Sequence, residues 1–152
     1  MPRADFYIID TNDPADRDRF ACRYISRARD HGKRIFVYTR SAEESRALDE
    51  VLWRFRPESF IPHTIVDQAE ADLADYPVLI SDQAPPATEK DVLLNLSGTL
   101  PAFHDRFERI AEIFNKAEES DLKAARQAYR RYRELGYEPN HHEIEKVGGT
   151  SE

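Results

Sequence analysis

The chain has 152 residues, of which 40% are hydrophobic and 34% charged, and its formal net charge is −7. A chain of this length suits one domain, which would bury about 68–70% of its unfolded surface. The composition is typical of a globular protein. A net negative charge excludes general adhesion to nucleic acid or to membranes, because such adhesion needs a positive surface. An anionic partner would therefore have to meet a local basic patch.

Cysteine usage and hydropathy exclude two further classes of protein. Cys22 is the only cysteine, so the chain forms neither an internal disulfide nor a thiolate metal cluster. No apolar stretch reaches about 18 residues, and the first residues lack the apolar core of a signal peptide. We therefore expect a cytoplasmic protein that makes no membrane contact.

Two strand–helix pairs are predicted at the start of the chain. Residues 5–10 form a short run rich in aromatic and β-branched residues, which is typical of a buried strand. Asp13-Pro14 favours the start of a helix, and Gly32 would end it. Residues 34–38 predict a second strand, and the capping box at residues 41–44 predicts the helix that follows.

Further strands are predicted in the middle of the chain. Residues 78–81 and 92–96 are apolar runs, and residues 61–66 would supply another short strand. Strands that alternate with helices imply right-handed crossovers and a mainly parallel sheet. The predicted fold class is therefore α/β, a three-layer Rossmann-like domain with a central sheet of about four to five strands. We expect it over residues 1–140, followed by a polar, flexible tail at 141–152.

Two more helices are predicted after Pro101. The first would carry apolar residues at helical spacing, namely Phe103, Phe107, Ile110 and Phe114. The second runs from about residue 121 to residue 135 and ends at Gly136. Beyond Pro139 the chain turns polar and is expected to fray.

The chain lacks the motifs of the common catalytic and cofactor sites. It has neither a G-x-G-x-x-G motif nor a P-loop, and the first strand–helix connection, residues 10–14, would put two carboxylates where a phosphate sits. No G-x-S-x-G elbow is present. His63, His141 and His142 lack a second ligand at a metal-binding spacing. We therefore expect no catalytic residues, no cofactor and no metal.

The last predicted helix carries a row of cations. On a helical wheel they fall within about 80° of one another, and they are Lys123, Arg126, Arg130 and Arg133. Tyr129 lies beside them, so the face suits a ligand with carboxylates and an apolar anchor. The alternative is a solvated face whose cations pair with nearby acids, namely Glu119, Asp121 and Glu134.

Trp53 is the second unusual feature. The apolar stripe of its helix is centred between Val51 and Phe55 on the helical wheel, and Trp53 points roughly 150° away from that stripe. Phe60 follows shortly after, so the two rings would form an exposed aromatic patch of the kind that anchors protein interfaces. The alternative is that the loop through Pro57 and Phe60 folds back and covers the indole.

Several stretches together resemble the chi subunits of bacterial DNA polymerase III holoenzyme, and the resemblance extends from residue 6 to about residue 137. The sharpest matches are Gly32-Lys33-Arg34 and the segments at residues 48–53, 58–63, 91–96 and 125–132. The acidic loop at residues 67–75 has no counterpart in this resemblance.

The resemblance implies a Rossmann-like domain that is not itself an enzyme but a subunit of a DNA-directed DNA polymerase assembly. Chi subunits pair with the psi subunit of the clamp loader and hold the acidic C-terminal tail of single-stranded DNA-binding protein. Psi contacts would fall on Trp53 and Phe60. Tail contacts would fall on Arg126, Tyr129 and Arg130 with the neighbouring Lys123 and Arg133, on Gly136 at the helix end, and less directly on Phe114.

The expected function is therefore a non-catalytic accessory role in the bacterial replisome, with DNA met only through its binding protein. Two alternatives stay open. One is a small nucleotide-dependent enzyme on a Rossmann-like sheet. The other is a module that binds single-stranded DNA directly through the basic helix and its aromatic residues.

Overall fold

The computed structural model describes residues 2–55, 61–66 and 72–145. Within them the chain forms a seven-stranded sheet in which all paired strands are parallel, in the order β3-β4-β2-β5-β6-β1-β7. The strands are β1 (Arg3–Ile9), β2 (Ile35–Tyr38), β3 (His63–Ile65), β4 (Val78–Ser81), β5 (Val92–Asn95), β6 (Arg109–Asn115) and β7 (Asn140–Glu143).

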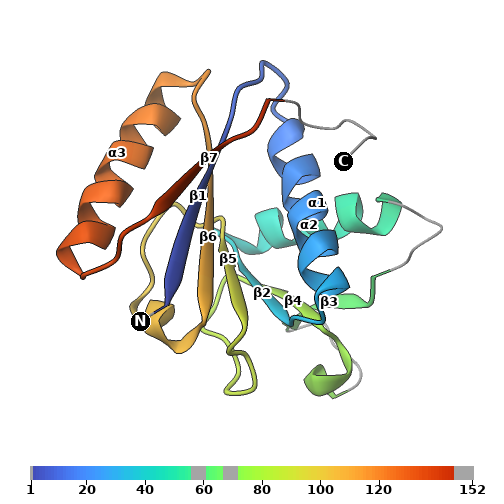
Figure 1. Cartoon of the computed structure of the whole chain (residues 1–152). Coiled ribbons are helices and arrows are strands. Elements are labelled where there is room, and N and C mark those ends of the chain that lie inside the picture. The colour runs from blue at the N-terminus through green and yellow to red at the C-terminus, as the bar shows by residue number, and fades with distance from the viewer. Residues whose placement is uncertain (1, 56–60, 67–71, 146–152) are drawn as a thin grey trace.

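Helices cover both faces of this sheet, which makes three layers (Figure 1). The α-helices α1 (Asp16–Asp30) and α2 (Ala42–Arg54) lie on one face, and α3 (Glu119–Glu134) lies on the other. Two short 3₁₀ helices, η3 (Leu73–Asp75) and η4 (Ala102–Arg106), occupy the connections. The α/β, three-layer, Rossmann-like prediction is confirmed.

The core lies on both sides of the sheet because the central strands are apolar along their whole length. In β2, Ile35 and Val37 join the cluster under α1 and α2, whereas Phe36 between them joins the cluster under α3. All three side chains are fully buried. A parallel sheet covered on both faces requires such continuous apolar runs, and these are the runs from which the strands were predicted.

Local signals placed most element ends correctly. The Ser41 hydroxyl accepts a hydrogen bond from the Glu44 amide at 3.2 Å at the start of α2. The Asp13 carboxylate accepts one from the Ala15 amide at 3.0 Å just before α1. The backbone of Gly32 has φ 73°, a conformation that side chains other than hydrogen disfavour, and it turns the chain from α1 toward β2.

The prediction of a long helix after Pro101 is wrong. Only residues 102–106 are helical there, as η4, and the segment that contains Ile110 and Phe114 is the strand β6. The apolar residues repeat every three or four positions, which mimics a helix. A strand buried on both faces shows no alternation that would distinguish it.

The sheet also has more strands than the four to five predicted, because β6 and β7 add to the five expected. The chain past Pro139 was expected to fray, but Asn140–Glu143 pair with β1 as the edge strand β7. Residues 146–152 lie outside the described residues. No helix in the described part of the chain is both long and apolar enough to cross a bilayer.

Candidate functional site

The helix α3 is built to present one polar face and to bury the other. Its first turn holds Glu119 and Asp121, which suit the positive end of the helix dipole. The Asp121 carboxylate also accepts a hydrogen bond from the Asn115 amide at 2.7 Å, which joins the start of α3 to the end of β6. Tyr132 is the fully buried side chain of the helix.

The end of α3 is a Schellman motif centred on Gly136. The amide of Tyr137 donates to the Tyr132 carbonyl at 3.0 Å, and the amide of Gly136 donates to the Arg133 carbonyl at 3.0 Å. Gly136 has φ 96°, where a side chain would be strained. This turn sends the buried Tyr137 back under the helix and directs the chain toward β7.

We use the name basic stripe for the four predicted cations Lys123, Arg126, Arg130 and Arg133. All four are exposed on α3. None of them forms an ion pair with any residue that the structure describes, so the predicted pairing with Glu119, Asp121 and Glu134 is not found within that part of the chain. The stripe is therefore uncompensated positive charge on an acidic protein.

Tyr129 adds a partly exposed ring beside the basic stripe. Its side chain is 38% exposed. The inner edge of the ring packs against Phe6, with centroids 6.5 Å apart. Its other neighbour is His141 of β7, with centroids 5.3 Å apart. Sequence reasoning missed His141, because nothing in the polar segment at residues 140–143 predicted a strand that would bring it to this helix.

Phe114 lies below this surface rather than on it. It belongs to β6, is only 7% exposed and packs against Phe6 with centroids 5.3 Å apart. The structure therefore brings the basic stripe, Tyr129 and Gly136 together on α3 and its end. It places Phe114 in the core beneath them.

A buried polar cluster anchors α3 to the sheet. Glu112 of β6 accepts a hydrogen bond from the Tyr132 hydroxyl at 2.7 Å and another from the Asn95 amide group at 2.8 Å. Burial raises the pKa of Glu112 from 4.5 to about 7, although both hydrogen bonds act in the opposite direction. Burial also raises the pKa of Tyr132. These contacts fix the rotation of α3, and with it the direction in which the basic stripe faces.

The second predicted surface surrounds Trp53 near the end of α2. Its side chain is 56% exposed, as its position opposite the buried Leu48 and Leu52 required. The indole meets His63 of β3 edge to face, with centroids 5.1 Å apart. His63 Nε2 lies 3.2 Å from the Asp49 carboxylate, whose pKa is raised mainly by burial. Phe60 lies outside the described residues, as does the rest of the loop that would cover the indole in the alternative interpretation.

The two surfaces lie on opposite faces of the sheet. Figure 1 shows α3 on one side and α2 on the other, with the strands between them. A partner held by the basic stripe would therefore leave the Trp53 surface open to a second partner.

The edge where a Rossmann-like protein holds a nucleotide is occupied by the protein's own side chains. Such ligands bind at the carboxyl ends of the strands, against the start of the first helix. Here the Asp13 carboxylate accepts a hydrogen bond from the Ala15 amide, and the Thr11 hydroxyl donates one to the Asp16 carboxylate at 2.6 Å. Arg19 pairs with both carboxylates. These contacts engage the Ala15 amide and the Thr11 hydroxyl, and they place the carboxylates of Asp13 and Asp16 at this edge, where negative charge disfavours a phosphate.

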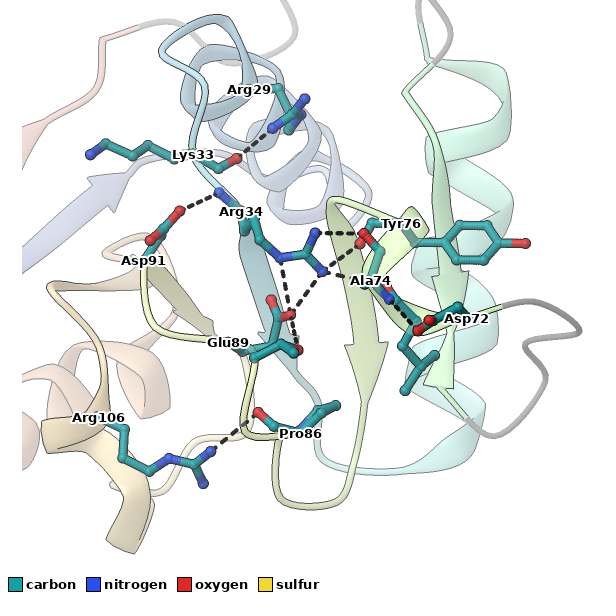
Figure 2. Close-up of polar contacts among 12 residues, drawn as sticks. Arg29, Lys33, Arg34, Asp72, Ala74, Tyr76, Pro86, Glu89, Asp91 and Arg106 are labelled. Atoms are coloured by element: carbon teal, nitrogen blue, oxygen red, sulfur yellow. Dashed lines mark hydrogen bonds and ion pairs between the residues drawn. The ribbon is translucent and has the colours of Figure 1, made fainter.

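Arg34 is the centre of a network that sequence reasoning did not assign (Figure 2). Its guanidinium donates to the Glu89 carboxylate at 2.8 Å and to the Tyr76 and Ala74 carbonyls at 2.8 and 3.1 Å. Glu89 is 1% exposed, and the Arg34 amide donates to Asp91 at 2.8 Å. The network joins the amino ends of β2, β4 and β5, so we assign it a structural role. Its only sequence signal was Gly32-Lys33-Arg34 in the resemblance.

The described residues contain no group of three or more His, Cys, Asp or Glu side chains that could hold a metal ion. His63 and His142 instead face single carboxylates, of Asp49 and Asp5 respectively. Cys22 is buried in α1, and burial raises the pKa of its thiol to about 12.

The fold and its two surfaces define a Rossmann-like α/β protein with an occupied nucleotide edge, an exposed cationic helix and an exposed tryptophan. Residues 1–140 match the family described as DNA polymerase III chi subunit, HolC. The chain is 37% identical to the DNA polymerase III subunit chi of Pseudomonas aeruginosa, over 97% of this chain and 100% of that protein. It is 28% identical to the Escherichia coli subunit chi, over 92% and 97% of the two chains, and 29% identical to that of Haemophilus influenzae, over 95% and 97%.

The chain therefore belongs to the family of DNA polymerase III chi subunits. It is a component of a replicative polymerase assembly and has partners within it.

Proposed function

We propose that this chain is a non-catalytic link, which binds the acidic C-terminal tail of single-stranded DNA-binding protein on α3 and the psi subunit of the clamp loader at Trp53. DNA is then reached only through its binding protein. The observation that carries the proposal is the basic stripe, four exposed cations that no described residue neutralises. An uncompensated row of this kind on an acidic protein suits an anionic partner.

In this proposal the tail lies along α3. Arg126 and Arg130 hold its carboxylates, because a planar guanidinium binds a carboxylate through two parallel hydrogen bonds. Lys123 and Arg133 extend the field at either end of the stripe. Tyr129 supplies an exposed ring for an apolar side chain of the tail.

Two other residues from the resemblance have supporting roles in the proposal. Gly136 lets the chain pass close under the end of the helix. Phe114 supports the site from below through Phe6, against which Tyr129 also packs.

The decisive experiment titrates the tail peptide of the organism's own single-stranded DNA-binding protein against wild type and Arg126→Ala. A short peptide that orders on binding is expected to bind with about micromolar affinity. Loss of one charge-assisted pair costs about 1.5–3 kcal/mol, so affinity should fall about 10- to 100-fold. Affinity should also fall as salt rises.

Arg131→Ala is the matched control. It removes the same charge from the same helix, but Arg131 lies about 120° from the centre of the stripe on the helical wheel. Its affinity for the peptide should stay close to that of wild type. Equal affinities for wild type and Arg126→Ala would exclude the stripe as the tail site.

The psi surface is tested independently with Trp53→Ala. The side chain is largely exposed, so thermal stability should change little while binding to purified psi weakens. Tail binding by this variant should equal that of wild type, because α2 and α3 lie on opposite faces. Psi binding that is unchanged in Trp53→Ala would refute this assignment.

A further inference from the structure

A cavity of about 1050 Å³ lies beside α1, away from both proposed surfaces. It is bounded by the last turns of α1, by the amino ends of β1, β5 and β6, and by β7. Nucleotides in Rossmann-like proteins bind at the opposite, carboxyl edge of the sheet. This groove is therefore neither the nucleotide crevice nor part of the α3 surface.

Cations gather in this groove. We use the name groove cations for Arg3, Arg23, Arg27, Lys33 and Arg109. Among the described residues, the carboxylates of Asp91, Glu108 and Glu143 line the same cavity, Asp5 is buried behind Arg3 and Arg109, and Glu108 pairs with Lys33. The whole chain has 22 Lys and Arg against 29 Asp and Glu, so the balance of charge in the groove is reversed. An anionic ligand would therefore be attracted to this groove, although the chain as a whole is acidic.

A buried carboxylate orients two of the groove cations. Asp5 is fully buried, and its oxygens lie 3.2 Å from Arg3 Nε and 3.8 Å from Arg109 Nε. Arg3 contacts Asp5 through Nε, and its two terminal nitrogens have no partner among the described residues. Its side chain is 50% exposed, so these nitrogens can reach a ligand. Such a held guanidinium is suited to binding a phosphate through two hydrogen bonds.

The remaining wall of the groove is aromatic. Tyr7 and Tyr24 line the cavity with ring centroids 5.3 Å apart. His142 of β7 stacks on Tyr7 at 4.8 Å with an interplanar angle of 17°, and its Nε2 lies 3.0 Å from Asp5. Aromatic rings beside a cationic track are the combination with which proteins bind the bases and phosphates of single-stranded nucleic acid.

We propose that this groove binds a nucleoside phosphate unit, with the phosphate on Arg3 and Arg27 and the base against Tyr24 and His142. The unit comes either from a segment of single-stranded DNA or from a free nucleotide. An acidic peptide would use the cations but would leave the aromatic wall without a planar partner. The groove thus adds a direct nucleic-acid contact to a protein that otherwise meets DNA through a partner.

The test measures the anisotropy of a labelled oligothymidylate of about 15 nucleotides with the full chain at low salt, and uses calorimetry with thymidine monophosphate as the second arm. The groove variant is Arg3→Gln with Arg27→Gln, because both side chains are exposed and Asp5 keeps Arg109 and His142. The matched control, Arg126→Gln with Arg130→Gln, removes the same charge from α3.

Wild type should bind the oligonucleotide, and the groove variant should bind about tenfold more weakly, while the α3 control changes affinity less than about twofold. The slope of log affinity against log salt should fall by about 0.7 in the groove variant, the value for one lost phosphate contact on a single strand. A different outcome is that wild type binds the monophosphate and not the oligonucleotide. If the groove variant loses that binding, the source of the unit is a free nucleotide.

Three results would overturn the proposal. In the first, wild type binds neither probe. In the second, the groove and α3 variants lose the same affinity for the oligonucleotide, and in the third the acidic tail peptide binds in the groove rather than on α3. Amide chemical shifts of wild type on addition of the oligonucleotide give a test that needs no variant. The shifts should centre on residues 23–33, and shifts centred on residues 123–133 would refute the groove.

Discussion

Stability should depend on pH through Glu112, and Glu112→Gln tests this dependence. Both hydrogen bonds to the side chain, from Tyr132 and from Asn95, end on the same oxygen, Oε2. A glutamine carbonyl in that position accepts both of them. The substitution therefore removes the charge without removing the contacts that hold α3.

The sign follows from the raised pKa. In the folded protein the pKa of Glu112 is about 7, against 4.5 for the free side chain, so the folded state disfavours the ionised form. This contribution to stability is complete below about pH 4.5 and is lost as the pH rises through about 7. The shift corresponds to a loss of about 3 kcal/mol.

The measurement is urea unfolding of both proteins at about pH 5 and pH 8. At pH 5 the free energies of unfolding should agree within about 1 kcal/mol, and at pH 8 the variant should be more stable by up to about 3 kcal/mol. Glu108→Gln is the control, because Glu108 is exposed and should leave the pH dependence of wild type intact. A Glu112→Gln variant with the same pH dependence as wild type would refute the reasoning.

Two further predictions concern a core side chain and the partner of a buried carboxylate. Phe114→Ala should cost about 3–5 kcal/mol in urea unfolding, because it empties a core position under α3. If Phe114→Ala binds the tail peptide more weakly but keeps the unfolding free energy of wild type, Phe114 contacts the peptide instead. Arg34→Ala should cost about 3–5 kcal/mol, because it leaves the carboxylate of Glu89 buried without its cation. A double-mutant cycle with Glu89→Gln should give a coupling energy above about 1 kcal/mol, and additive effects would contradict the network.

The sequence predicted the strands best where apolar residues are consecutive. Residues 78–81 and 92–95 are buried at every position, and both strands were placed almost at their observed ends. The same property misled the prediction at β6. Ile110 and Phe114 occur at helical spacing in a segment buried on both sides, and only the pairing with β1 and β5 determines that it is a strand.

The strand β7 had no signal in the sequence at all. Its residues are polar, and its position depends on backbone pairing with β1 and on contacts of His142 with Asp5 and Tyr7. Those partners lie more than a hundred residues away in the chain. Local propensity contains no information about contacts of that kind.

For the candidate site, the wheel geometry of one helix was sufficient to find the basic stripe. Helical spacing determines which residues share a face, and the observed α3 retains that spacing. The wheel could not reveal His141 beside Tyr129 or the cluster around Glu112, because these depend on which strand lies under the helix. The groove beside α1 was missed for the same reason, since its cations come from several elements.

The position of β1 also constrains how this protein is made on the ribosome. Residues 3–9 pair with β6 and β7, whose residues are 109–115 and 140–143. The strand β1 is therefore synthesised long before either of the strands with which it pairs. Until then the backbone of β1 has no strand to pair with, as in other proteins dominated by non-local pairing. A nascent chain stalled before β6 should thus be a substrate for chaperones, and release of β6 and β7 should let β1 pair along both of its edges.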